Sequence, residues 1–132
     1  MTPPEAPLPN DQVGQSAPLA GHLRLQTLKA RADFLRAARA RRIVTPGFVL
    51  QYRPRADDSE AIRVGITCSK KVGNAVARNR AKRRLREIAR AVIPERGARG
   101  TDYVLIGRAD ITATRPFEDM LADLRDALAR AT

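Results

Sequence analysis

Apolar residues recur at helical spacing in three parts of this chain, which predicts three helices. The first covers about residues 29–42, which lack Gly and Pro, and its period favours Leu35 over Phe34 for the packed stripe. The second follows the short loop around Gly73, and Pro94 with Gly97 and Gly100 is expected to end it. The third covers about residues 117–128 and starts with two acids, which suit the positive end of the helix dipole.

Three apolar runs predict strands between these helices. Residues 48–53 and 62–68 flank a polar turn at residues 57–60, so the two strands are expected to pair as a hairpin. Residues 103–106 are continuously apolar, which is typical of a strand buried on both faces. The order helix, strand, strand, helix, strand, helix, with one possible extra short strand, predicts an α+β two-layer sandwich centred on a strand–helix–strand unit.

Composition separates the first residues from the rest of the chain. Residues 1–20 hold five of the nine prolines, two acids and no base, which predicts a disordered tail, and residues 21–132 are expected to form a single domain. A basic and apolar secretory signal is absent, and the apolar runs are too short for a membrane span. The sequence therefore favours a cytoplasmic protein that does not bind membranes.

The densest cluster of cationic residues in the sequence lies in the second predicted helix and just before it. Residues 70–90 contain nine cations and a single acid, Glu87, in a chain whose formal net charge is +11. A helix places its apolar stripe on one side and its cations opposite and on the flanks, including Arg84 and Arg90. A solvated charged face normally interleaves Glu with Lys, and this one does not. Because guanidinium groups bind phosphate in a bidentate manner, the pattern favours a nucleic-acid-binding face.

Catalytic groups are scarce in this sequence. The only histidine, His22, lies at the edge of the predicted tail, and the acids outside the tail fall in a solvated turn, at helix starts or at scattered surface positions. Cys68 is the only cysteine; it is in phase with the apolar residues of its strand, so a small buried residue is expected there. Neither a protein metal site nor a catalytic residue is predicted.

A specific motif surrounds the basic helix. It consists of Arg63-Val64-Gly65, then Ser69-Lys70-Lys71-Val72-Gly73-Asn74-Ala75-Val76, then Arg78-Asn79-Arg80 and Lys82-Arg83. With Asp33-Phe34, Phe48-Val49-Leu50 and Asp102-Tyr103 outside it, this pattern closely resembles the bacterial ribonuclease P protein subunit over about residues 24–130. The resemblance implies a fold like the second domain of ribosomal protein S5, with a left-handed β-α-β crossover.

The same resemblance implies a function. The family's protein is the auxiliary subunit of an endoribonuclease, a ribozyme that removes the 5′ leader from precursor tRNA, and the RNA subunit carries the catalysis. The implied partners are that catalytic RNA and precursor tRNA, with no DNA. Mg²⁺ is implied in the holoenzyme, held mainly by RNA, with none bound by the protein alone.

Two sets of RNA-binding residues follow from the resemblance. The set expected to face the ribozyme RNA is Lys70, Lys71, Asn74, Arg78, Asn79, Arg80, Lys82, Arg83 and Arg86. The set expected to line a cleft for the 5′ leader is Phe34, Val49, Gln51 and Arg53. Phe34 is equally interpretable as a stacking platform or as a core residue. Some family members carry aromatic residues where Ala38 and Gln51 stand, so weaker stacking is expected here. Three cations of the first helix, Arg31, Arg36 and Arg39, could compensate or form a solvated face.

Two other functions compete with the ribonuclease P interpretation. A ribosomal or general RNA-chaperone protein could carry the same basic helix and would bind many RNAs without affecting cleavage. A protein-only nuclease would cut RNA without an RNA subunit, and the missing pair of histidine and acid argues against it.

Overall fold

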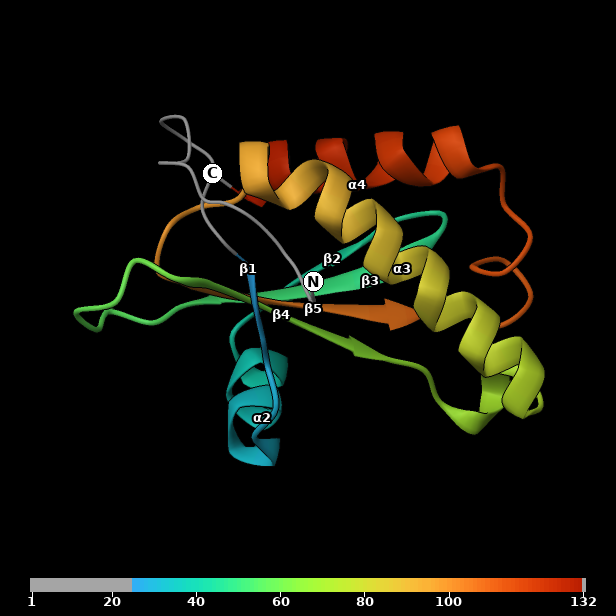
Figure 1. Cartoon of the computed structure of the whole chain (residues 1–132), viewed down its shortest axis with the longest axis horizontal. Helices are drawn as coiled ribbons and strands as arrows, with labels where there is room; N and C mark the ends of the chain where they lie inside the picture. The colour runs from blue at the N-terminus through green and yellow to red at the C-terminus, as the bar shows by residue number, and fades with distance from the viewer. Residues whose placement is uncertain (1–24, 132) are drawn as a thin grey trace, which may run out of the picture.

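The computed structural model describes residues 25–131, which share one five-stranded mixed sheet with helices on both faces (Figure 1). The predicted tail at residues 1–20 lies outside this range. In chain order the elements are β1 (Leu25–Thr27), α2 (Arg31–Arg39), β2 (Arg41–Val44), β3 (Phe48–Pro54), β4 (Ile62–Thr67), the short 3-10 helix η1 (Lys70–Val72), α3 (Ala75–Arg96), β5 (Thr101–Gly107) and α4 (Phe117–Ala131). The predicted α+β class is confirmed, but the prediction of two layers is wrong, because helices cover both faces of the sheet.

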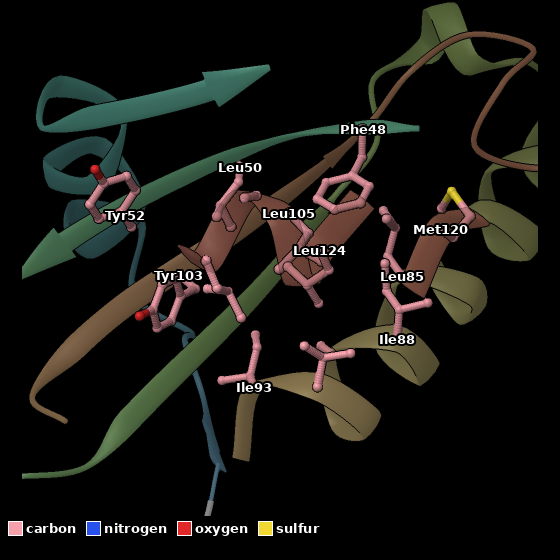
Figure 2. Close-up of a cluster of buried hydrophobic side chains, with 14 of the residues drawn as sticks. Phe48, Leu50, Tyr52, Leu85, Ile88, Ile93, Tyr103, Leu105, Met120 and Leu124 are labelled. Carbon is pink, nitrogen blue, oxygen red and sulfur yellow. The ribbon is translucent and has the colours of Figure 1, made fainter. Parts of the chain in front are cut away.

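The two faces of the sheet are covered differently. Helices α3 and α4 lie on one face and α2 lies on the other (Figure 1). The larger core fills the space under α3 and α4, where Phe48, Leu50 and Leu105 from the sheet meet Leu85 and other apolar residues of these helices (Figure 2). A smaller cluster of Leu28, Ala37 and Val104 lies under α2. The side chains of β3 and β5 therefore alternate between two apolar layers.

The predicted hairpin of the strands at residues 48–53 and 62–68 is wrong. The sheet order is β1-β4-β5-β3-β2, so β5 lies between β3 and β4. Strand β5 is buried on both faces, as its continuous apolar run predicts, and such a strand gains most from the central position. The antiparallel hairpin is instead formed by β2 and β3.

The predicted strand–helix–strand unit is present. Strands β4 and β5 are parallel neighbours, and α3 connects them across the face that it covers. Parallel neighbours need a long crossover, which α3 supplies. The hand of this crossover and the likeness to ribosomal protein S5 remain predictions.

The sequence allowed for one extra short strand, whereas the structure has two, β1 and β2, at the edges of the sheet. β1 and β2 have three and four residues, and most of their side chains are exposed. Backbone pairing with β4 and β3 holds them in place. Because edge strands of this kind bury little apolar surface, they leave no hydrophobic pattern in the sequence.

The first helix is shorter than predicted and uses a different stripe. It ends at Arg39, and β2 begins two residues later. Leu35, which the apolar period placed in the packed stripe, is 43% exposed, whereas Ala37 is fully buried and Phe34 is half-buried. Phe34 and Ala37 are three residues apart, which brings both onto the helix face that packs against the sheet.

Helix α3 ends among the residues that were predicted to stop it. Pro94 lies inside its last turn, the helix ends at Arg96, and the backbone N–H of Gly97 donates to the carbonyl oxygen of Ile93. The proline removes a single hydrogen bond near the helix terminus, and the burial of Val92 and Ile93 on the sheet keeps the last turn helical. Among residues 25–131, no helix has the length and apolar character that crossing a membrane requires.

Candidate nucleic-acid interface

Helix α3 separates apolar and cationic side chains onto opposite sides, as predicted. Ala81, Leu85 and Ile88 are fully buried against the sheet. The polar and cationic residues that are exposed on the other side are Asn79, Arg80, Arg83, Arg86 and Arg90. Arg78 and Lys82 are half-buried on the flanks. The helix therefore presents a row of guanidinium groups while its apolar side anchors it.

The start of α3 extends this row toward the loop after β4. The carboxamide oxygen of Asn74 accepts a hydrogen bond of 2.9 Å from the backbone N–H of Ala77, so Asn74 caps the helix. Lys71 is exposed in η1, and the backbone of Lys70 belongs to the same short helix. The predicted residues of this segment are thus contiguous with the exposed face of α3.

Cys68 lies beneath the flank of this surface. It is partly buried and packs against the larger core, which largely agrees with the small buried residue predicted at this position. Burial raises the pKa of its thiol, and the nearby charges of Lys82 and Arg78 oppose that shift. These two cations therefore lie near the end of β4, at the border between helix and sheet.

Arg84 has a structural role that its position in the charge run conceals. Its Nη1 donates to the carbonyl oxygen of Thr112 at 2.9 Å, and its Nη2 donates to the carbonyl oxygen of Arg115. These bonds fasten α3 to the segment between β5 and α4. The side chain of Arg84 therefore stabilises the fold and does not belong to the exposed row of guanidinium groups on α3.

We expect Arg84→Gln to lower the free energy of unfolding by about 1–3 kcal/mol, because two charge-assisted hydrogen bonds are lost. The salt dependence of RNA binding should stay unchanged, since this side chain contacts no phosphate. Urea denaturation measures the first quantity and titration of RNA at several salt concentrations measures the second. A reduced salt dependence with unchanged stability would place Arg84 on the RNA-binding face instead.

A groove lies between α2 and the sheet. Its volume is about 490 Å³, and it is lined by Lys29, Arg31, Phe34, Leu35, Ala38, Gln51, Ile66, Thr67 and Val104. Two of the predicted cleft residues, Phe34 and Gln51, meet in it. Val49 and Arg53 do not line it: Val49 is 9% exposed, and Arg53 lies 4.0 Å from the carboxylate of Asp102. Lys29, Thr67 and Val104 come from three different segments, so no local pattern identified them.

Phe34 lies directly over the backbone of β4. A Cβ atom on Gly65 would lie 2.5 Å from the Cε1 atom of Phe34, so only glycine allows the ring to approach this closely. The ring is half-buried and packs against the smaller cluster under α2. It therefore contributes to the core and also forms part of the groove surface.

Asp102 holds the α2 side of the sheet together through buried ion pairs. Its carboxylate is fully buried and accepts hydrogen bonds from Arg55 at 2.8 Å and from Arg63 at 2.7 and 2.6 Å. Arg63 also pairs with Asp33 of α2 at 3.3 Å. The Asp102 hydrogen bonds raise the pKa of Arg63 against the opposing effect of burial. This chain of contacts fixes α2 relative to β4 and β5.

The prediction that the acids outside the tail lie in turns, at helix starts or on the surface is wrong for two residues. Asp102 is buried, and Asp123 is buried with its carboxylate 2.8 Å from Nε of Arg115. Asp102 balances the charges of the buried Arg55 and the partly buried Arg63, and Asp123 balances the charge of the partly buried Arg115. Within residues 25–131, no group of three or more His, Cys, Asp and Glu side chains could hold a metal ion.

Known proteins are similar to this chain in both sequence and fold. The family model for ribonuclease P matches residues 23–132. The chain belongs to the ribonuclease P protein family. The ribonuclease P protein component of Ruegeria pomeroyi is 62% identical over 105 residues, covering 79% of this chain and 84% of that protein. That of Paramagnetospirillum magneticum is 50% identical over 111 residues, covering 81% and 83%.

Solved structures of ribonuclease P proteins agree with the fold. The protein from Staphylococcus aureus superposes with a TM-score of 0.65 at 28% identity, covering 80% of this chain and 94% of that one. The protein from Thermotoga maritima gives a TM-score of 0.64 at 30% identity, covering 80% and 96%. The resemblance inferred from the motif around the basic helix is therefore confirmed, and with it a role in tRNA processing as part of an endoribonuclease. The RNA-chaperone alternative is not favoured.

Proposed function

We propose that this chain is the auxiliary protein subunit of ribonuclease P, and that an RNA subunit carries out the cleavage of precursor tRNA. The observation that supports this most is the unpaired charge on α3. Within residues 25–131, none of Arg80, Arg83 and Arg86 forms an ion pair, whereas Arg55, Arg63 and Arg115 elsewhere in the fold do. Unpaired cations in one row repel each other unless phosphates neutralise them.

The exposed face of α3 would bind the catalytic RNA. The residues assigned to this contact are Lys70, Lys71, Asn74, Arg78, Asn79, Arg80, Lys82, Arg83 and Arg86. Contacts of this kind go to phosphates, so they set affinity and orientation and read little sequence. Mg²⁺ needed for the reaction would be held mainly by the RNA, with the protein cations reducing the repulsion between the two RNAs. We place the complex in the cytoplasm.

The α2 groove would bind the single-stranded 5′ leader. Single strands bind where aromatic rings stack on bases within a cationic groove, and here Phe34, Lys29 and Arg31 line the same groove. Gln51 supplies polar contacts from the sheet. Val49 and Arg53, which the resemblance also assigns to the leader, do not line the groove, since Val49 is buried and Arg53 lies next to Asp102.

Cleavage of a precursor tRNA at low magnesium tests the proposed function. We expect efficient cleavage only when the protein and the cognate RNA subunit are combined, and little from either alone. Cleavage by the protein alone would overturn the assignment of catalysis to RNA. Binding without any stimulation of cleavage would revive the RNA-chaperone alternative.

An added aromatic residue should strengthen leader binding. Ala38 is exposed, lines the groove, and lies one helical turn after Phe34. We expect Ala38→Tyr to tighten binding of a precursor with a leader by about fivefold or more, because one stacked base contributes about 1–3 kcal/mol. Mature tRNA without a leader is the control and should bind equally to both proteins. Equal tightening for mature tRNA would show that the groove does not hold the leader.

A further inference from the structure

A second cavity lies at the open edge of the sheet. β1 pairs with β4 only as far as Val64, whose carbonyl oxygen accepts a 2.9 Å hydrogen bond from the N–H of Leu28. Beyond that point, no strand within residues 25–131 covers this edge of β4. A cavity of about 310 Å³ lies at this edge, lined by residues 25–28 of β1 and its end, by Phe34, and by side chains of β4 and α3. This is near the lower limit of volumes that hold small ligands in proteins.

The lining of this edge cavity combines two kinds of chemistry. The apolar surface comes from Leu25, Leu28, Phe34, Val64, Ile66 and Ala89. Gln26 and Thr27 add polar side chains from β1, and Arg86 and Arg90 supply two exposed guanidinium groups. Apolar walls with an aromatic ring suit a flat base, and paired guanidinium groups suit phosphate. A nucleotide requires both surfaces at once, whereas an inorganic anion would leave the apolar walls unused.

The backbone of β4 adds hydrogen-bonding groups. Since Val64 directs its carbonyl oxygen toward β1, Ile66 two residues later directs its N–H and C=O toward the same side. No described strand pairs there, so this donor and acceptor face the cavity edge. The edge of a base carries the complementary acceptor and donor.

The edge cavity adjoins the α2 groove, since Phe34 and Ile66 line both of them. A single strand that leaves the groove past Phe34 would have the cavity next to it. Arg86 and Arg90 lie beyond Phe34 along this path, on the helix assigned to the catalytic RNA.

We propose that the edge cavity binds the base of one unpaired nucleotide of the 5′ leader, with a flanking phosphate on Arg90, next to the Arg86 contact with the catalytic RNA. The inference rests on the proposed function, because it extends the leader path beyond the groove. Arg90, which the motif did not include, becomes a substrate-binding residue. The leader then runs from α2 around the edge of β4 to α3.

A series of precursor tRNAs with one abasic leader position each tests this proposal. With the wild-type protein assembled on the RNA subunit, one position should lose about fivefold or more in affinity when its base is removed. Arg90→Gln removes the phosphate contact, and Ala89→Met fills the cavity. Both variants should bind the intact precursor more weakly than the wild-type protein does. In both, removing that same base should cause no further loss of affinity. Arg90 is exposed, so Arg90→Gln keeps the test valid if Ala89→Met does not fold.

The controls separate this proposal from the assignment of function. Arg125→Gln, an exposed substitution on α4, should leave every abasic effect intact. If both cavity variants retain all abasic effects while cleavage is still stimulated, the edge cavity is not a base site and the proposed function stands. If Arg90→Gln weakens mature tRNA and precursor equally, the leader assignment is overturned. Absence of stimulation by the wild-type protein would instead refute the proposed function.

Discussion

Replacing Asp102 by Asn is expected to lower the free energy of unfolding by about 3 kcal/mol or more. The substitution keeps the shape of the side chain but leaves Arg55 and Arg63 without their buried counter-charge, and breaking a buried ion pair from one side typically costs about 3–5 kcal/mol. Arg55 is the more costly partner, because its side chain is only 4% exposed. Urea denaturation followed by circular dichroism measures the effect.

The matched control is Asp126→Asn. Asp126 pairs with Arg130 at 3.2 Å on α4, where both side chains are exposed, and such pairs contribute little. We expect a change below about 0.5 kcal/mol in this variant. If Asp102→Asn were no more destabilising than Asp126→Asn, the buried cluster would not be what fixes α2 against the sheet.

The triple substitution Arg80→Gln, Lys82→Gln, Arg83→Gln should weaken binding to the ribonuclease P RNA by about 100-fold at moderate salt. Each phosphate contact is expected to contribute about 1 kcal/mol or more, and each one lost should reduce the salt slope by about 0.7–0.9 units. Stability should change little, because none of the three side chains forms an ion pair within residues 25–131. Filter binding across a range of potassium concentrations gives both affinity and slope.

A single substitution on another helix controls for net charge. Arg125→Gln removes one cation from α4, away from the proposed RNA-binding face, and should leave the salt slope unchanged. The single variants Arg80→Gln and Lys82→Gln should each show about a third of the change in slope. An unaltered slope in the triple variant would contradict the assignment of this face to RNA.

The fold was predictable from sequence wherever burial follows a regular period. Helices α3 and α4 each carry a period that matches their burial, and the central strand β5 carries the continuous apolar run of a strand buried on both faces. The edge strands β1 and β2 carry none, because backbone pairing defines them and their side chains face solvent. The hairpin prediction failed because strand order depends on which strand gains most from a central position, which local patterns do not encode.

The cationic face of the site was predictable, and the groove only partly so. Charge asymmetry on one helix identified the exposed row of α3, but it also included Arg84, whose bonds to distant carbonyls require the folded structure. Phe34 and Gln51 were correctly brought together by the family resemblance. The burial of Asp102 was missed because its three arginine neighbours, which come from β3, from the residue after β3 and from β4, are far from Asp102 in sequence.

The central claim is that α3 faces the catalytic RNA while the α2 groove holds the leader, and directed cleavage from tethered iron tests it most directly. A single cysteine at Glu87 or at Ala38, in a Cys68→Ser background, would carry the iron chelate in the complex with precursor tRNA. Both positions are exposed, one on each helix. The account predicts cuts in the catalytic RNA from Glu87→Cys and in the 5′ leader from Ala38→Cys. No cuts in the catalytic RNA from Glu87→Cys, or no cuts in the 5′ leader from Ala38→Cys, would contradict it.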